Sequence, residues 1–158
     1  MISKKLADLL RLQIKSELTA HQMYFAISLY FQRQSLDGWG KLFYAQSMEE
    51  AGHAKKIMDF MLDTDTHFDL PALGGVATKF GSAREAVEAA LASERRVTKE
   101  FTKMAKVATE ESDAVGLQFL QWFLEEQVEE EAKMLKILDL IDSGINLFQA
   151  EPLLENME

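Results

Sequence analysis

Apolar residues recur every three or four positions along four long segments of this 158-residue chain. An α-helix turns once every 3.6 residues, so this spacing places the apolar residues on one face of each helix. Four amphipathic helices can bury those faces only against one another, and the pattern therefore predicts an all-α helical bundle. The predicted helices run from about Lys4 to Gln34, Trp39 to Asp63, Ala83 to Thr109, and from just after Ser112 or Asp113 to about Asp142.

Helix-capping residues and connection lengths support this division. Ser3 is a suitable N-cap, and Ser82 with Glu85 forms a capping box. A short break at residues 35–38 joins the first two helices, which should therefore run antiparallel. Residues 64–81 form a much longer connection, which suits a crossover along the bundle between helices two and three. Residues 145–158, around Pro152, are expected to form a short fifth helix or a tail.

Composition excludes several classes of function. The chain has no cysteine, so it has no disulfide, thiolate zinc site, iron–sulfur cluster or cysteine nucleophile. Its formal net charge of −9 repels phosphate backbones, so we expect small cations and no nucleic acid as partners. No apolar run approaches the roughly 20 residues that span a bilayer, and Met1–Lys5 leads into no apolar signal core. These features predict a cytoplasmic protein without a membrane segment.

The apolar face of each predicted helix is interrupted near its middle by a carboxylate. These residues are Glu17, Glu50, Glu94 and Glu130, and His53 follows Glu50 by three residues. A spacing of three places Glu50 and His53 on the same face of one helix. Antiparallel packing would bring all four interruptions to a similar depth, so we expect four glutamates and one imidazole to converge inside the bundle.

Such a cluster is unfavourable without a counter-charge. Burial of one ionised carboxylate costs several kcal/mol, and four together repel, so some would have to hold protons. Two divalent ions would balance four carboxylates while the imidazole stays neutral. Oxygen-rich donors with one nitrogen and no sulfur suit iron or manganese. The hypothesis is therefore a carboxylate-bridged diiron centre whose metal binding releases protons.

These residues resemble the ferroxidase centre of the prokaryotic non-haem ferritins. The resemblance rests on Glu17, Glu50-Ala51-Gly52-His53, Glu94 and Glu126-Gln127-Val128-Glu129-Glu130, and covers residues 3–142. It implies a ferritin-like four-helix bundle forming a single domain over residues 1–158. It also implies a homo-oligomeric shell of 24 subunits that takes up ferrous iron, oxidises it with dioxygen or hydrogen peroxide, and stores ferric mineral.

The resemblance also assigns roles to individual residues. Glu17 and His53 would hold the first iron, Glu94 and Glu130 the second, and Glu50 would bridge both. By the same resemblance, Tyr24 and Gln127 would line the centre. A third iron site that shares Glu130 would be formed by Glu49, Glu126 and Glu129.

Some features separate this chain from related families. Ala51 stands where bacterioferritins carry a haem-ligating methionine, and Glu130 where they carry a second histidine, so no haem is expected. Rubrerythrins need cysteines, which are absent, and DNA-protecting mini-ferritins build their site between subunits. The chain after Ser143 is shorter than the fifth-helix region of most ferritins.

Other interpretations remain open from the sequence. The chain could be a diiron oxidase or peroxidase that forms no cage, or a passive acidic helical interaction protein without metal. Tyr24 and Gln127 could be packed core residues, and Glu49, Glu126 and Glu129 an ordinary acidic surface. His21 is expected to be a packed or interface residue rather than a ligand, and His67 part of a solvated loop.

Overall fold

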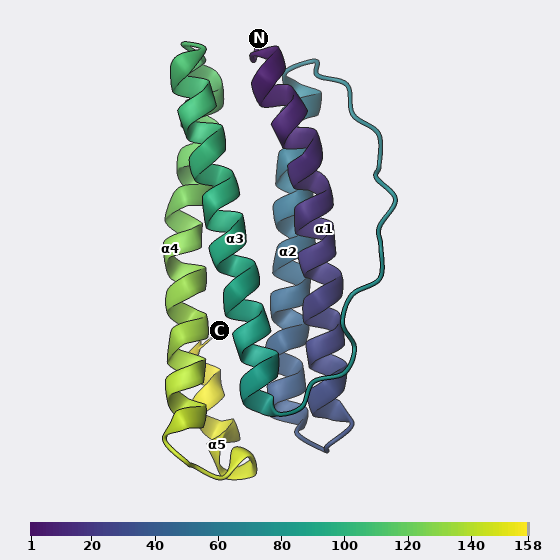
Figure 1. Ribbon diagram of the computed structural model, residues 1–158, viewed down its shortest axis with the longest axis vertical. Helices are drawn as coiled ribbons and strands as arrows, with labels where there is room; N and C mark the ends of the chain where they lie inside the picture. Colours follow the sequence, from purple (N-terminus) through teal and green to yellow (C-terminus); the bar gives the residue numbers. More distant parts are fainter. Residues whose placement is uncertain (158) are drawn as a thin grey trace.

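The computed structural model describes residues 1–157, so Glu158, the last residue of the predicted tail, lies outside the described part. Within residues 1–157 the regular structure is entirely helical, which confirms the all-α prediction (Figure 1). None of these helices is long and apolar enough to cross a membrane. The helices are α1 (Lys4–Gln32), α2 (Asp37–Asp63), α3 (Ala83–Glu110), α4 (Ala114–Asp142) and α5 (Leu147–Leu154), and a 3₁₀ turn follows at Glu155–Met157.

The four long helices pack as two antiparallel pairs. Helix α1 pairs with α2 and α3 with α4, and α1 also contacts α3. Residues 64–82 run along the outside of α1 from one end of the bundle to the other (Figure 1). This long connection makes α2 and α3 run in the same direction, as the predicted crossover requires.

Side chains at the predicted caps begin three of the helices. Ser3 accepts a hydrogen bond from the Leu6 amide, and Ser82 accepts one from the Glu85 amide. Asp113, rather than Ser112, is the N-cap of α4. Its buried carboxylate accepts the amides of both Gly116 and Ser3, each at 2.8 Å, so it joins the starts of α4 and α1.

A residue with left-handed backbone follows each long helix within three residues of its end. Ser35, Asp65 and Ser112 have φ values of 60°, 52° and 54°, and Gly144 follows α4 with a φ of 80°. After α2, the Thr66 amide donates back to the Met61 carbonyl at 2.7 Å, the wrap-around bond of a Schellman ending. Equivalent bonds close α1 and α3. These turns stop α1 two residues earlier than the apolar pattern predicted.

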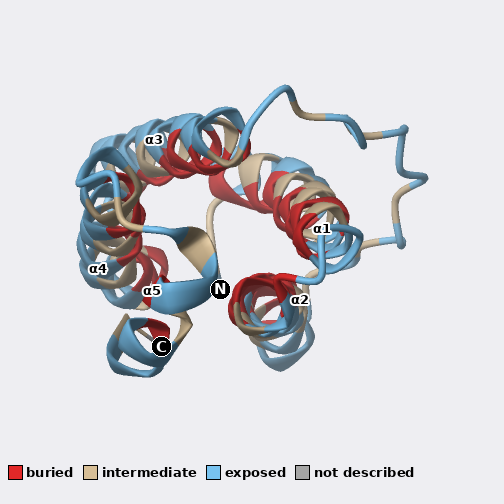
Figure 2. Ribbon diagram, turned by 90° about the horizontal axis from the view of Figure 1, so that it is seen from below, coloured by how far each residue is buried: buried red, intermediate tan, exposed pale blue. Residues whose placement is uncertain are grey.

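The bundle core consists of two apolar clusters separated by a polar layer. One cluster surrounds Phe31, Trp39 and Phe43, and the other surrounds Leu10, Phe101 and Phe123. Buried residues face the centre of the bundle on all four long helices (Figure 2). The predicted glutamates lie between the two clusters.

The tail forms the short helix α5, which packs against the start of α2. The Trp39 indole donates to the Leu147 carbonyl at 2.9 Å, and the Glu151 carboxylate accepts the Gly38 amide at 2.8 Å. The N-cap of α2, Leu36, makes no side-chain cap bond. Glu151 therefore satisfies one of the amides that a helix start leaves unpaired.

Candidate metal centre

The polar layer contains the four glutamates and the histidine that the sequence predicts to converge inside the bundle. Glu17, Glu50, Glu94 and Glu130 are at most 2% exposed, and His53 is 6% exposed. Each comes from the apolar face of its helix, two from α2 and one each from α1, α3 and α4. The convergence expected from helical spacing is therefore present in the structure.

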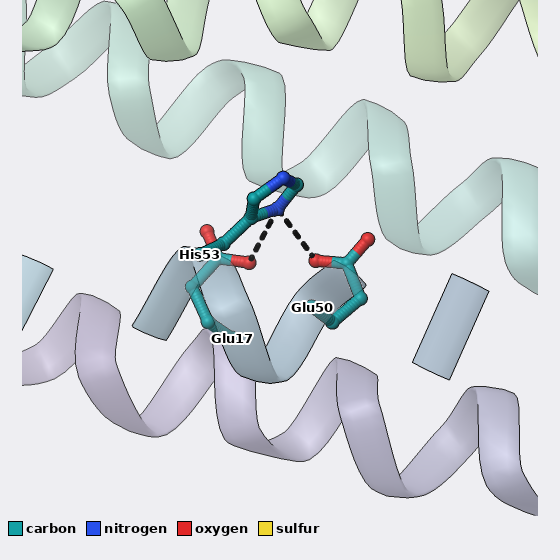
Figure 3. Close-up of side chains that lie close together, drawn as sticks. All are labelled: Glu17, Glu50 and His53. Carbon is teal, nitrogen blue, oxygen red and sulfur yellow. Dashed lines mark hydrogen bonds and ion pairs between the residues drawn. The ribbon is translucent and has the colours of Figure 1, made fainter. Parts of the chain in front are cut away.

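Three donor atoms meet where α1 faces α2. His53 Nδ1 lies 3.1 Å from Glu50 Oε2 and 3.9 Å from Glu17 Oε2 (Figure 3). The other Glu17 oxygen accepts a hydrogen bond from Gln13 at 3.0 Å. Glu17 Oε2 is fully buried and has no hydrogen-bond partner among the described residues. A buried carboxylate oxygen without a partner is costly, and a bound cation would satisfy it.

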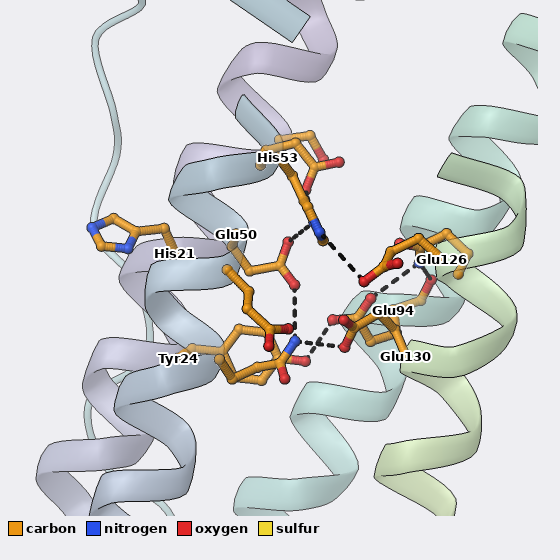
Figure 4. Close-up of polar contacts among 12 residues, drawn as sticks. His21, Tyr24, Glu50, His53, Glu94, Glu126 and Glu130 are labelled. Atoms are coloured by element: carbon orange, nitrogen blue, oxygen red, sulfur yellow. Dashed lines mark hydrogen bonds and ion pairs between the residues drawn. The ribbon is translucent and has the colours of Figure 1, made fainter. Parts of the chain in front are cut away.

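A second group joins α2 to the α3–α4 pair. One oxygen from each of Glu50, Glu94 and Glu130 lies within 4.8 Å of the other two. The Tyr24 hydroxyl donates to Glu94 Oε1 at 2.6 Å (Figure 4). Gln127 Nε2 donates to Glu94 Oε2 at 3.0 Å. Tyr24 and Gln127 thus orient Glu94, and Glu50 belongs to both this group and the first.

The residues expected at a third site are dispersed. Glu126 is half-buried, with Oε1 3.8 Å from His53 Nε2, and it groups with His53 and Glu130. Glu49 and Glu129 are exposed. Among the described residues neither belongs to a compact donor group. Their part in a third iron site stays a prediction.

Burial and mutual repulsion raise the pKa values of three of the carboxyl groups and so favour their protonated forms. Burial, followed by the charge of Glu50, raises the pKa of Glu17 well above its ordinary value of 4.5. The same two causes raise the pKa of Glu94 to about 8. Burial raises the pKa of Glu130 to about 9, although the nearby charge of Lys133 opposes the rise.

Glu50 and His53 form the charged pair of the metal-free centre. Burial raises the pKa of Glu50, but the hydrogen bond and charge of His53 outweigh burial, so the net direction is downward. Burial lowers the pKa of His53, but the bond and charge of Glu50 reverse this and raise it. These pKa shifts favour one carboxylate and one imidazolium beside three neutral carboxyl groups, an arrangement with little net charge.

Three further polar side chains contact the glutamates and were not assigned a role from the sequence. They are Gln13, Gln46 and Lys133. Gln13 precedes Glu17 by four residues and Gln46 precedes Glu50 by four, and each amide donates to its glutamate. This repeated spacing is a signal that the sequence contains, because residues four apart lie adjacent on a helix. Lys133 lies one turn after Glu130, and no repeated spacing in the sequence indicates that it contacts the glutamates.

The two remaining histidines lie away from the centre. His21 Nδ1 is 2.8 Å from both the carbonyl and the hydroxyl oxygen of Ser47, and its ring points away from the glutamates (Figure 4). His67 is exposed in the crossover, with Nε2 3.4 Å from Asp69. Both match the non-ligand interpretations.

The donor set fits a pair of divalent cations. It offers carboxylate oxygens and one imidazole, with an unpaired oxygen on Glu17 and a carboxylate on Glu50 shared between two groups. Hard to borderline divalent ions such as Fe²⁺ and Mn²⁺ bind such donors. Cation binding would also remove the repulsion that now holds protons on Glu17, Glu94 and Glu130.

Comparison with known proteins agrees with this geometry. The sequence model of the ferritin-like domain family matches residues 7–143. The chain is 41% identical to Ferritin BfrB of Mycolicibacterium smegmatis over 151 residues, covering 95% of this chain and 83% of the relative. It is 35% identical to the bacterial non-heme ferritin of Staphylococcus epidermidis over 141 residues, covering 89% of this chain and 85% of the relative.

Solved structures show the same fold. An open pore ferritin from the archaeon Archaeoglobus fulgidus superimposes with a TM-score of 0.87 at 32% identity, covering 89% of this chain and 86% of that one. A humanized archaeal ferritin superimposes with a TM-score of 0.93 at 29% identity, covering 98% and 97% of the two chains.

Proposed function

The chain belongs to the ferritin family as a prokaryotic non-haem ferritin, and from this premise we propose that it oxidises ferrous iron and stores the ferric product. The observation that carries the proposal is the buried convergence of Glu17, Glu50, His53, Glu94 and Glu130 on two overlapping donor groups. Two ferrous ions held at these groups would lie next to each other, because Glu50 contributes to both.

Each ferrous ion gives up one electron, so the pair supplies the two that reduce dioxygen, with two protons, to hydrogen peroxide. A pair of ions could likewise reduce peroxide to water. The protein's part is to hold the two ions close together and to balance their charge. Tyr24 and Gln127 orient Glu94 for this role, and Glu49, Glu126 and Glu129 are proposed to attract a third ion beside the centre.

We further propose that the chain works in a closed homo-oligomeric shell, of 24 subunits by family resemblance, without haem. Large apolar side chains are exposed next to one another on the outer face of the α1–α2 pair. Soluble monomers rarely expose large contiguous apolar patches, which often mark an interface. Phe25 is 40% exposed, Tyr44 46% and Met48 48%, and the rings of Phe25 and Tyr44 lie 5.8 Å apart. A second copy packed on this face would bury them.

Rapid mixing tests the oxidation. The metal-free protein is loaded anaerobically with ferrous iron in steps and mixed with oxygenated buffer. We expect a fast absorbance change that saturates at about two ions per chain, the number that balances the carboxylates, and that disappears when zinc is added first. Oxidation no faster than in buffer alone would refute the proposed activity.

Size measurement tests the shell. Light scattering on the purified protein should give a mass of several hundred kilodaltons. Fast oxidation by a small oligomer would instead favour a diiron oxidase or peroxidase without a cage. Thermal stability unaffected by divalent metal would favour a passive helical protein, because a ligand that binds only the folded state must stabilise it.

A further inference from the structure

The second donor group, formed by Glu50, Glu94 and Glu130, is engaged internally in the metal-free chain. Gln46 is 3% exposed, and its Nε2 donates to Glu130 Oε2 at 2.5 Å and to Glu50 Oε1 at 3.3 Å. One amide nitrogen therefore bridges two of the three carboxyl groups that would bind a metal ion there.

Lys133 fixes the direction of this amide. Its ammonium donates to Gln46 Oε1 at 2.9 Å, and an ammonium can only donate. The oxygen of Gln46 must then face Lys133, and its nitrogen must face the two glutamates. Lys133 Nζ also lies 3.9 Å from Glu130 Oε2 and 3.6 Å from Glu49 Oε2, with its side chain only 18% exposed.

The first donor group, formed by Glu17, Glu50 and His53, contrasts with this arrangement. Glu17 Oε2 is buried and has no hydrogen-bond partner among the described residues. A cation arriving at the first group finds one carboxyl oxygen that has no hydrogen bond to give up, although it must break the 3.1 Å contact between His53 and Glu50. A cation arriving at the second group must displace the Gln46 amide and settle near the positive charge of Lys133.

We propose that Gln46 and Lys133 are positioning residues that make the two metal positions fill in sequence, the first group before the second. This deepens the function proposed above and rests on it. In the metal-free chain the neutral amide of Gln46 takes the place of a metal ion and hydrogen-bonds both Glu50 and Glu130. Lys133 orients this amide and repels an incoming cation. Together they lower the affinity of the second position. They leave that of the first almost unchanged, because Gln46 contacts Glu50 at Oε1 whereas His53 contacts it at Oε2.

Zinc titration of the metal-free protein, followed by calorimetry, tests the order of filling without any oxidation. Zinc binds glutamate and histidine donors and does not change its redox state. The wild-type chain should bind one ion per subunit about tenfold or more tightly than the next, the range in which residues that orient ligands act on metal affinity.

Two substitutions separate the amide from the charge. Gln46→Leu keeps the approximate volume and changes no charge, so it removes the hydrogen bonds to the two glutamates, and the acceptor of Lys133, while the ammonium stays in place. Lys133→Met keeps the aliphatic stem and removes the ammonium. In both variants we expect the second affinity to rise about tenfold and the first to change less than about threefold. Lys136→Met removes an exposed lysine from the same helix and should match the wild-type chain. Lys133→Arg keeps the charge and should restore the separation of the two steps.

The possible outcomes distinguish this inference from the function on which it rests. Two zinc ions bound with unchanged relative affinity in Gln46→Leu and Lys133→Met would overturn the sequential filling and leave the diiron centre intact. A wild-type chain that binds no zinc tightly would overturn both. Equal increases at both positions in Lys133→Met, with no change in Gln46→Leu, would show a general charge effect and overturn the role of the amide.

Discussion

The hydroxyl of Tyr24 and the carboxyl group of Glu94, 70 residues apart in the sequence, are joined by a 2.6 Å hydrogen bond inside the bundle. Both side chains are buried, and the bond connects the α1–α2 pair to the α3–α4 pair. It acts against burial and the charge of Glu50, which raise the pKa of Glu94, because a donor to the carboxylate favours the charged form.

Tyr24→Phe should therefore affect both stability and metal binding. Loss of a donor to a buried carboxyl group is expected to lower the free energy of unfolding by about 1–3 kcal/mol. The pKa of Glu94 should rise further, which weakens metal binding at the second group. Urea unfolding and zinc titration measure the two effects. Tyr30→Phe, at a half-buried position in the same helix, is the control. Equal unfolding free energies and equal zinc affinities in the two variants would contradict the role of Tyr24 in orienting Glu94.

The raised carboxyl pKa values predict how metal-free stability depends on pH. The folded chain holds protons on Glu94 up to about pH 8 and on Glu130 up to about pH 9, whereas the unfolded chain releases them near 4.5. The stabilising contribution of protonation is complete below pH 4.5 and is lost as pH rises through 8–9. His53, whose pKa is also raised, acts in the same direction.

The melting temperature of the protein in chelator should consequently fall between pH 4.5 and about pH 9, over the window set by the unfolded and folded pKa values of Glu94 and Glu130. Bound zinc keeps the carboxylates ionised and should flatten this dependence. Glu130→Gln, which stays neutral at every pH, should remove part of the slope. A melting temperature that rises over this range without metal would contradict the protonated state.

Metal binding near neutral pH should release protons. Glu17, Glu94 and Glu130 hold protons in the metal-free chain because their pKa values are raised, and a ligand must give up its proton to bind. A pH-stat titration with ferrous iron under anaerobic conditions measures the release, which should decrease as the starting pH approaches 9. No release at pH 7 would remove the charge argument for the diiron centre.

Glu130→Ala and Glu94→Ala should each impair the second metal position. The first position keeps Glu17, Glu50 and His53 in both variants. Because the proposed reaction needs two adjacent ions, the fast phase of iron oxidation should slow by at least about tenfold. Stopped-flow absorbance at two ferrous ions per chain provides the measurement. Glu125→Ala, at an exposed position of α4, should react at the wild-type rate.

Helix α5 should depend on Glu151. Its carboxylate accepts the Gly38 amide at the start of α2, as an N-cap side chain would. Glu151→Ala is expected to lower the free energy of unfolding by roughly 0.5–2 kcal/mol and to speed proteolysis of the tail. Glu155→Ala, at an exposed position just after the helix, is the matched control. Identical proteolysis of the two variants would contradict the anchoring role.

Helical spacing was sufficient to predict the middle of the bundle and less accurate at its ends. All four glutamates and His53 are buried where their spacing placed them. At the periphery, Phe60 and Phe119 continue the predicted apolar pattern but are only half-buried, and they stack on each other with centroids 3.8 Å apart. Met61 and Leu120, one residue further along, are fully buried instead. In α2, a straight helix drifts relative to a seven-residue repeat, so the buried face shifts from Phe60 to Met61. In α4, the buried residues Leu120, Gln127 and Met134 keep the seven-residue spacing, so Phe119 lies one residue off the buried face.

Side-chain contacts between helices could not be predicted in the same way. The bond from Lys133 to Gln46 joins residues 87 positions apart, and it depends on the rotation of α4 relative to α2. Single-helix periodicity contains no information about that rotation. The anchoring of α5 by Glu151 is missed for the same reason, since the sequence predicts only a short fifth helix or a tail and names no residue that attaches it.

The long crossover has a consequence for how the chain folds. The α1–α2 pair supplies every donor of the first group, and the α3–α4 pair supplies Glu94 and Glu130. Each pair is a hairpin of nearby sequence that can form early, whereas their docking must close the long 64–82 connection. An ion held by Glu50 and Glu94 together would bind the docked hairpins and not the separated ones. Iron should therefore slow the unfolding of this protein by opposing the separation of its two halves.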